Sequence, residues 1–363
     1  MRCKYEMVAD NIREDIKSGC YRPGETLPPE NDLAEEHGVS RMTLRKGVDE
    51  LVEQGLLVRR QGSGTYVSSN IDRETYLYIG PTRGHLDSTR YAALNGECQR
   101  KQHSLSAYAT DNGDGHDTEH VKDLAGEASR VICHCAAWGD FREVLPPELP
   151  VVFVSGWGGV ENPDFTDRPA YIISTDARRA SERATRHLIE LGHEEICYFG
   201  PGQPGVPVEG YRSLRSSNAL YQSHLNVLRE TGLESGGGLG FPENTDDEQA
   251  EAERYLRNFI DERGGWPTAF VCEGDFRAAP LIRVAMRDGL QLPDDLSIVG
   301  MCNTPWAEML TPPLTSVSLR EDKIARLAVD MSENPPPDAP TVIRLDPQLV
   351  KRASSTKAPQ KKS

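Results

Sequence analysis

Residues 38–67, GVSRMTLRKGVDELVEQGLLVRRQGSGTYV, restrict the fold of the amino-terminal part more than any other stretch. Gly38 ends one helical pattern, and Ser40 is a favourable N-cap for a following helix whose apolar residues recur at helical spacing. Gly55 closes that helix, and two short β-type segments follow, joined by a turn that contains two glycines. The stretch therefore predicts a helix followed by a glycine-tipped β-hairpin.

Two further helical patterns precede this stretch. One face of the first carries apolar side chains at a period of about 3.6 residues: Tyr5, Val8, Ala9, Ile12 and Ile16. Gly19 and the Pro23-Gly24 turn end this helix, and a second helix starts near Pro29, with the proline in its first turn. Three helices and a hairpin are the plan of a winged helix-turn-helix, which we expect to occupy residues 1–68.

Cationic side chains are concentrated in this region of an acidic chain. They are Arg41, Arg45, Lys46, Arg59 and Arg60. The whole chain has a formal net charge of −15, whereas residues 1–70 contain 10 Lys and Arg against 12 Asp and Glu. An acidic balance argues against a protein that coats nucleic acid over its whole surface, but it permits a small local footprint.

The position of these cations suits the recognition of double-stranded DNA. A helix fits the major groove, and its N-terminal turn usually reaches the bases. Arg41 and Arg45 lie one turn apart there, and each guanidinium can donate two hydrogen bonds to O6 and N7 of guanine. The Ser40 and Thr43 hydroxyls suit phosphates or base edges. The cations expected to hold backbone phosphates are Lys46, Arg59 and Arg60.

The order and spacing of these residues resemble the GntR family of bacterial regulators over residues 4–68. The resemblance rests on LPPENDLAEEHGVSRMTLRKGVDEL, on QGLL and on QGSGTYV, and it implies a DNA-binding regulator. It implies DNA contacts at Ser40, Arg41, Thr43, Arg45, Gln61 and Gly62. We add Glu30, Asn31, Lys46 and Arg60 to the expected DNA-binding residues. Pro29 stands where the family usually has serine, and Asn31 replaces a frequent arginine, so one cationic contact is missing.

The rest of the chain alternates between strand-like and helical patterns. Strands are predicted at TYLYIG, SLSAYAT, RVICHCAA, PVVFVSG, AYIIST, ICYFG, PTAFVCEG and LSIVGM. Such β–α repetition predicts parallel sheets with helices on both faces. Because this part is large for one sheet, we expect an α/β domain of two lobes with a cleft at residues 76–350. Residues 69–75 are expected to be a linker, and residues 351–363 a disordered basic tail.

Ligands of open parallel sheets bind beyond the carboxyl ends of the strands. The effector-binding residues expected there are Thr82, Arg83, Ser155, Trp157, Asp275 and Asn303. The Trp157 ring suits stacking on a sugar or another planar ligand, but it equally suits a core or a lobe interface. Arg83 is either an anion contact or a solvated side chain. Asp275 either contacts a ligand or caps the following helix.

Two stretches of this domain resemble the effector domain of the LacI/GalR family, which is related to periplasmic sugar-binding proteins. They are STDARRASERATRHLIELGHEEICYFG and PTAFVCEGDFRAAPLIRVAMRDGLQLPDDLSIVGMCNTPWAEMLTPPLTSV. A GntR-like head on such a domain is similar to the architecture of arabinose-type repressors. Family positions that often hold Asp or Asn for sugar hydroxyls are Ser155, Gly274 and Cys302 here, which weakens or redirects sugar recognition. A sugar, another small molecule or no effector is compatible with this pattern.

Other chemistry finds no support in the sequence. Paired carboxylates, a nucleophile constellation and a metal-ligand set are absent, so we expect no enzyme, no metal site and no cofactor. The eight cysteines include no Cys-x-x-Cys pair and are expected to be buried thiols in a reducing cytoplasm. The sequence has no apolar run of about 18 residues and no signal peptide, so no membrane partner is expected.

The sequence thus predicts a cytoplasmic transcription regulator, with repression as the expected direction. Two copies would dimerise through the two-lobed domain and place two heads on a roughly palindromic DNA operator, under the control of a small molecule such as a sugar. The alternatives are a cytoplasmic small-molecule-binding protein with a vestigial head, and a regulator that has no effector.

Overall fold

The chain divides into two units, each described by itself. The computed structural model describes residues 3–60, 63–68, 74–110, 117–155, 166, 168–201, 212–241 and 248–360. We call Met1–Glu74 with Gln99–Ser104 the head, and Thr75–Cys98 with Leu105–Ser363 the body. Thr75, expected in the linker, already begins the first strand of the body. Its carbonyl oxygen accepts a hydrogen bond from the Ser129 N–H at 2.9 Å, so pairing extends to this residue.

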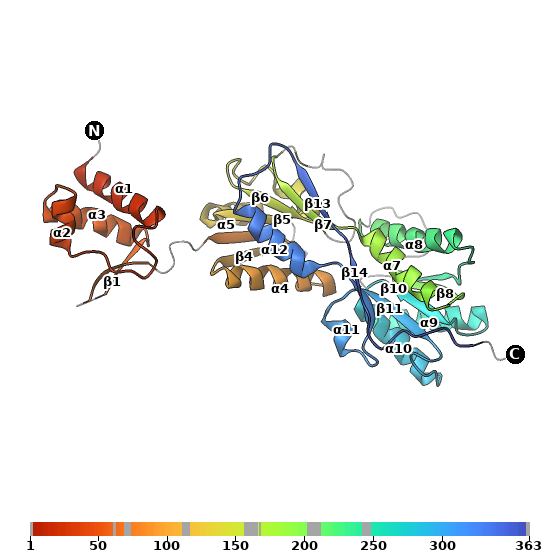
Figure 1. Cartoon of the computed structure of the whole chain (residues 1–363). Helices are drawn as coiled ribbons and strands as arrows, with labels where there is room; N and C mark the ends of the chain where they lie inside the picture. Colours follow the sequence, from red (N-terminus) through yellow and green to blue (C-terminus); the bar gives the residue numbers. More distant parts are fainter. Residues whose placement is uncertain are drawn as a thin grey trace. The chain divides into compact units, whose positions relative to one another are not determined.

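The head is a three-helix domain with a two-stranded wing (Figure 1). Its described elements are α1 (Lys4–Lys17), α2 (Glu30–Glu36), α3 (Arg41–Glu53), β1 (Leu57–Arg60) and β2 (Gly64–Val67). The helices close on one core that includes Ile12, Leu33 and Leu44. α1 crosses α3 at Gly47, where an added Cβ would lie 2.8 Å from the Tyr5 carbonyl oxygen, so only glycine permits this close approach. The predicted winged helix-turn-helix is confirmed.

The N-cap of α2 and the pairing of the two wing strands complete the description of the head. Pro29 is the N-cap of α2 rather than a residue of its first turn, because its backbone is extended (ψ 143°). β1 and β2 pair antiparallel from Leu57 opposite Val67 to Arg60 opposite Gly64. The residues between them at the tip, Gln61 and Gly62, lie outside the described residues.

The body contains two sheets, each the centre of one lobe. The described elements of the first lobe are β3 (Thr75–Gly80), α4 (His85–Arg100), β4 (Ser104–Ala109), α5 (Thr118–Glu127), β5 (Arg130–His134), η1 (Cys135–Ala137), α6 (Trp138–Phe141), β6 (Val151–Val154), β7 (Tyr171–Thr175), α12 (Glu321–Ser332) and β13 (Thr341–Leu345). Its strand order is β13-β7-β6-β5-β3-β4, and the pairs from β13 to β3 are parallel. Figure 1 shows α12, from the carboxyl-terminal part of the chain, packed on this sheet.

The second lobe is built in the same way. Its described elements are α7 (Ala177–Glu190), β8 (Ile196–Pro201), α8 (Arg212–Glu230), β9 (Gly238–Phe241), α9 (Glu248–Arg263), β10 (Ala269–Cys272), η3 (Asp275–Arg277), α10 (Ala278–Arg287), β11 (Ser297–Cys302), α11 (Pro305–Met309), β12 (Thr315–Ser318) and β14 (Gln348–Val350). The strand order is β14-β12-β11-β10-β8-β9, parallel except for β14. The predicted class of fold, a winged helix-turn-helix with a two-lobed domain of parallel sheets, is confirmed.

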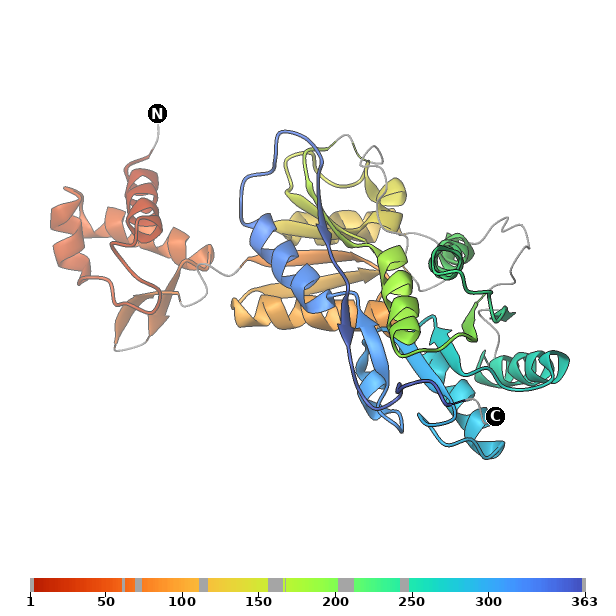
Figure 2. The same cartoon turned by 45° about the vertical axis from the view of Figure 1, so that its right-hand side comes forward.

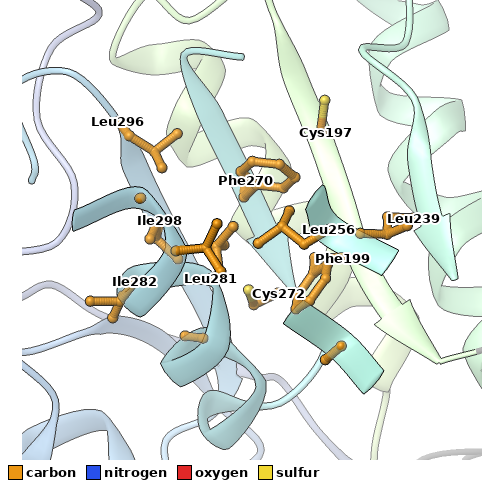
Figure 3. Packing of buried hydrophobic residues seen from close by; sticks show 14 of the residues in the cluster. Cys197, Phe199, Leu239, Leu256, Phe270, Cys272, Leu281, Ile282, Leu296 and Ile298 are labelled. Atoms are coloured by element: carbon orange, nitrogen blue, oxygen red, sulfur yellow. The ribbon is translucent and has the colours of Figure 1, made fainter. Parts of the chain in front are cut away.

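Both faces of each sheet are covered, because successive strand residues point to opposite sides. In β3, Tyr76 and Tyr78 pack toward α4 and α12, whereas Leu77 and Ile79 pack toward α5 and α6. In the second lobe, Phe270 joins a core with side chains of α9 and α10, and Figure 3 shows Leu256 beside it and Leu281 and Ile282 further along the same cluster. The continuous apolar runs of these strands follow from burial on both faces.

The described chain passes between the lobes three times, after β7, after β12 and after β13. Figure 2 shows the connection from β13 to β14 running from one sheet to the other. The Thr175 hydroxyl donates to the Leu319 carbonyl oxygen at 2.5 Å, which ties two of these connections together. Leu86 of α4, in the first lobe, packs into a core of the second lobe. The lobes therefore share contacts as well as connections.

The carboxyl-terminal residues pack on the second lobe, so the expectation of a disordered tail is wrong for residues 351–358. Ser354 is fully buried; its hydroxyl donates to the Ile298 carbonyl oxygen (2.6 Å) and accepts from the Thr315 N–H (2.8 Å). The Ala358 N–H donates to the Leu191 carbonyl oxygen (2.9 Å). Hydrogen bonds rather than apolar side chains hold this segment, so its composition gave no sign of it.

Within the described ranges, no helix has both the length and the apolar character needed to cross a membrane.

Candidate nucleic-acid interface and ligand site

A side-chain cap fixes the exposed start of α3. Ser40 is the N-cap and accepts a hydrogen bond from the Thr43 N–H at 3.2 Å, and the two hydroxyl oxygens lie 2.8 Å apart. Arg41 and Arg45 are both exposed, whereas Leu44 between them is buried. The cap satisfies a backbone donor of the first turn and orients it. The local sequence thus presents both guanidinium groups at one end of the helix.

Carboxylates of the head pair with two of the cations. Arg41 Nε lies 3.1 Å from Glu30 Oε2, and Arg59 Nη2 lies 3.8 Å from Glu30 Oε1. Arg59 also bonds the Asp49 carboxylate of α3. Glu30, at the start of α2, therefore links α3 to the wing. These partly exposed pairs are each worth about 1 kcal/mol or less, so DNA phosphates can compete for the cations.

Two aromatic rings support further cations. Lys46 Nζ lies 3.9 Å from the centroid of the Tyr5 ring, and the Arg60 guanidinium carbon lies 4.7 Å from that of Tyr66. Cation–π contacts of this kind hold a charge without neutralising it. Both cations therefore keep their hydrogen-bond donors for an anionic partner such as a phosphate.

Arg45 and Asn31 complete the described part of this surface. Both are exposed, and in the described part of the chain Arg45 makes no hydrogen bond or ion pair. Its five donors are therefore available for the edge of a base. The structure brings the expected cations of α3 and the wing onto neighbouring elements. Gln61 and Gly62, also expected to contact DNA, lie outside the described residues.

The expected ligand residues of the first lobe follow its strand ends. Thr82 and Arg83 lie just beyond β3, where Thr82 is half-buried and Arg83 exposed. Ser155 follows β6 and is buried, and its N–H donates to the Ile173 carbonyl oxygen at 3.0 Å, which continues the pairing with β7. Trp157 lies outside the described residues.

Asp275 is committed to contacts within the second lobe. It is 1% exposed, and its carboxylate accepts hydrogen bonds from the Thr304 N–H (2.6 Å), the Thr304 hydroxyl (3.0 Å) and the Ser316 hydroxyl (2.5 Å). A Cβ on Gly300 would lie 2.5 Å from its Oδ1 atom, so the missing side chain makes room for the carboxylate. The alternative that Asp275 caps the following helix is wrong, because the cap position belongs to Gly274 and the carboxylate binds later segments instead.

The titration of Asp275 leads to a testable pH dependence. Burial raises its pKa to about 6, against the opposing effect of the hydrogen bonds that it accepts. A carboxyl whose pKa is higher in the folded state contributes stability that is complete below its unfolded pKa, near 3.9. This contribution is lost as the pH rises through the folded pKa.

We therefore expect wild-type stability to fall relative to Asp275→Asn between about pH 4 and pH 6, by about 2–3 kcal/mol at 1.36 kcal/mol per pKa unit. Denaturant unfolding of both proteins across this range measures the difference. A difference in stability that is the same at every pH does not change the slope of stability against pH. Parallel curves would show that Asp275 does not titrate in this way.

Asn303 presents an acceptor without a partner. Its backbone is left-handed (φ 51°), as is that of Cys302 before it (φ 94°), and its N–H donates to the Ser316 hydroxyl at 3.0 Å. Among the described residues, no donor reaches its buried Oδ1 atom. An orphaned buried acceptor costs free energy that a ligand donor can recover.

A ring cluster between the lobes was missed by sequence reasoning. His85, the first residue of α4, stacks on Phe276 of η3 with ring centroids 3.6 Å apart and meets the edge of Trp306 of α11 at 5.8 Å. Burial, and secondarily Arg277, lowers the pKa of His85, so its ring is neutral at pH 7. Each ring lies within three residues of an expected ligand residue, but nothing in the local pattern distinguished it.

The carboxylate beside this cluster is also used within the protein. Glu273, at the end of β10, is buried, and its Oε2 accepts from the Tyr198 hydroxyl at 2.8 Å. The Arg277 guanidinium donates to the Glu273 carbonyl oxygen at 3.0 Å. The described strand ends thus offer rings and the Asn303 oxygen rather than unengaged carboxylates. Such groups can stack on a ring and accept a hydrogen bond.

The exposed cationic helix and the two-lobed body together define a class of protein. The class is that of DNA-binding transcription regulators with a two-lobed effector domain. Residues 4–67 match the model of bacterial regulatory proteins of the gntR family, and residues 185–355 match the periplasmic binding protein-like domain. The chain thus joins a segment that matches the gntR family model to a segment that matches the periplasmic binding protein-like domain.

Two relatives are similar over almost their whole length. An arabinose metabolism transcriptional repressor of Geobacillus stearothermophilus is 27% identical over 97% of this chain and 97% of its own. That of Halalkalibacterium halodurans is 24% identical over 100% and 99%. Both are named as transcriptional repressors.

Solved structures share the fold of the body. A LacI family transcriptional regulator from Arthrobacter sp. FB24, in complex with lactose, has a TM-score of 0.60 at 19% identity and covers 78% of this chain and 99% of its own. The dimeric Lac repressor has a TM-score of 0.59 at 17% identity, with coverage of 79% and 99%.

Proposed function

We propose that the protein is a cytoplasmic repressor that binds a roughly palindromic operator as a homodimer and is controlled by a small molecule such as a sugar. The observation that carries this proposal is the similarity to two repressors of arabinose metabolism along almost the whole chain, head and body in the same order. A two-fold symmetric operator follows from two identical heads.

In this proposal the head divides its contacts between bases and phosphates. Arg41 and Arg45 read guanine edges, and Ser40 and Thr43 contact phosphates or base edges. Glu30 balances Arg41 and Arg59 in the absence of DNA, and Asn31 faces the duplex from α2. The remaining residues expected to contact DNA, through phosphates or through the tip of the wing, are Lys46, Arg60, Gln61 and Gly62.

The effector is proposed to bind between the lobes, at the carboxyl ends of the strands. The expected contacts are Thr82, Arg83, Ser155, Trp157 and Asn303, and Asp275 would reach an effector only by giving up its hydrogen bonds to Thr304 and Ser316. The ring cluster of His85, Phe276 and Trp306 adds stacking surfaces, and the Asn303 Oδ1 atom adds an acceptor for a sugar hydroxyl.

The test is a titration of the full-length protein on a labelled duplex selected from random DNA. L-arabinose, D-ribose, D-glucose and lactose are added separately, and the dissociation constant for DNA is measured by anisotropy. We expect at least one sugar to change this constant about 5-fold to 150-fold, and DNA to change the affinity for that sugar by the same factor. Because linkage requires the two factors to be equal, unequal factors would show that the two titrations do not follow the same complex.

A second candidate is a regulator that has no sugar effector. It is favoured by Ser155, Gly274 and Cys302 at the positions of the usual sugar contacts, and by the internal bonding of Asp275 and Glu273. Unchanged DNA affinity with every sugar would support this candidate over the first. A protein that binds a sugar but no DNA sequence would instead indicate a vestigial head.

A further inference from the structure

Met42 is an exposed apolar side chain in the middle of the surface that faces DNA in the proposed function. It is the second residue of α3 and is 77% exposed, more than any other large hydrophobic side chain of the described residues. At about 100° per residue, it lies about 170° around the helix from the mean direction of the buried positions. Those positions are Leu44, Gly47, Val48 and Leu51. Met42 therefore contributes nothing to the core of the head.

Two cations share the exposed face of α3 with Met42. Arg45 and Lys46 lie three and four residues further on and are both exposed, so the three side chains share one face of the first two turns. Helical side chains lean toward the N-terminus, which carries Met42 to the leading end of the helix. In a DNA-binding helix of this kind, the residues at this end usually meet the bases.

We propose that Met42 reads the 5-methyl group of thymine in the major groove. Thymine is the base that carries an apolar group at its major-groove edge, and apolar side chains recognise it by contact. The thioether of methionine is flexible and polarisable, so it can follow a methyl group whose position varies slightly between sites. The flanking cations hold phosphates and guanines, and Met42 adds a preference for thymine between them.

This inference rests on the proposed function, because it requires specific DNA binding. Its size is set by the burial of about one methyl group against the side chain, which corresponds to about a fourfold change in affinity. An isolated exposed methionine is common on protein surfaces, so exposure alone does not decide its role. A test must therefore remove the two contacting groups separately and together.

The experiment combines changes in the protein with changes in the DNA. The full-length protein is bound to a duplex selected from random DNA, and each thymine is replaced in turn by deoxyuridine, which lacks only the 5-methyl group. The protein variants are Met42→Gln, which keeps length and helix propensity, and Met42→Leu, which keeps an apolar side chain. Met309→Gln, at a site that is 75% exposed in the body, is the matched control.

When deoxyuridine replaces thymine at one or two positions of each half-site, we expect wild type, Met42→Leu and Met309→Gln to lose about three- to fivefold in affinity. Met42→Gln should bind the thymine duplex as weakly as wild type binds the deoxyuridine duplex, and it should lose nothing more on removal of the methyl group. Equal losses in wild type and Met42→Gln, or no sensitive thymine, would overturn the inference and leave the proposed function standing. Absence of any sequence preference in wild type would overturn both.

Discussion

Replacing Glu321 with alanine is expected to lower the free energy of unfolding of the body by about 3–5 kcal/mol. Arg90 of α4 is fully buried, and its Nε and Nη2 atoms donate to the two oxygens of Glu321, each at 2.8 Å. Burial by itself would lower the pKa of Arg90, but the Glu321 carboxylate raises it above its usual range. Removal of this carboxylate leaves a buried guanidinium whose remaining acidic neighbour, within the described part of the chain, is Asp87 at 3.3 Å.

An exposed ion pair of the same body provides the control. Arg179 and Asp346 are 2.6 Å apart and 59% and 63% exposed, so Asp346→Ala is expected to change stability by about 1 kcal/mol or less. The double variant Arg90→Met with Glu321→Met removes both charges and should recover most of the loss. Denaturant unfolding measures all three. Equal losses in the free energy of unfolding for Glu321→Ala and Asp346→Ala would show that breaking the buried pair costs no more than breaking an exposed one.

Replacing Arg45 with alanine is expected to weaken binding to the selected DNA by about 1–3 kcal/mol, roughly 5-fold to 150-fold, and to relax the choice of one base pair. Arg45 is exposed at the start of α3, and the described residues leave its donors without an acceptor. Loss of a bidentate contact to guanine removes discrimination as well as affinity. Anisotropy titration on the selected duplex and on single-base variants measures both.

Lys46→Ala separates base reading from simple attraction to the backbone. Lys46 follows Arg45 in α3. Its ammonium lies over the Tyr5 ring of α1 and suits a phosphate. Its loss should weaken binding to all DNA sequences alike. It should also reduce the slope of log affinity against log salt concentration by about 1, the value expected for one phosphate contact. If Arg45→Ala behaved in the same way and left base choice intact, the assignment of Arg45 as a base reader would be wrong.

The head could be predicted from the sequence because local signals determine it. Gly38, the Ser40 cap and Gly55 each mark one helix boundary, and the structure has α3 at Arg41–Glu53. The environment of its cations could not be predicted, because it depends on contacts between elements. Glu30 reaches Arg41 and Arg59 only after α2, α3 and the wing have packed together.

In the body, the class of fold could be predicted from the β–α alternation, but the contacts that position the candidate ligand site could not. The carboxylate of Asp275 is bonded by Thr304 and Ser316, which lie 29 and 41 residues away in the sequence. His85 meets Phe276 across the two lobes. The tail at Ser354 is held by hydrogen bonds to two strands, and its composition resembles that of unfolded segments.

Selection of bound duplexes from random DNA by the full-length protein tests the central claim most directly. The account predicts enrichment of one inverted repeat whose half-sites contain guanine, with affinity that falls steeply as salt is added. A protein with Arg41→Ala and Arg45→Ala together should enrich no sequence in the same selection. Recovery of an unenriched pool by the wild-type protein, even at low salt, would contradict the assignment of this chain as a sequence-specific regulator.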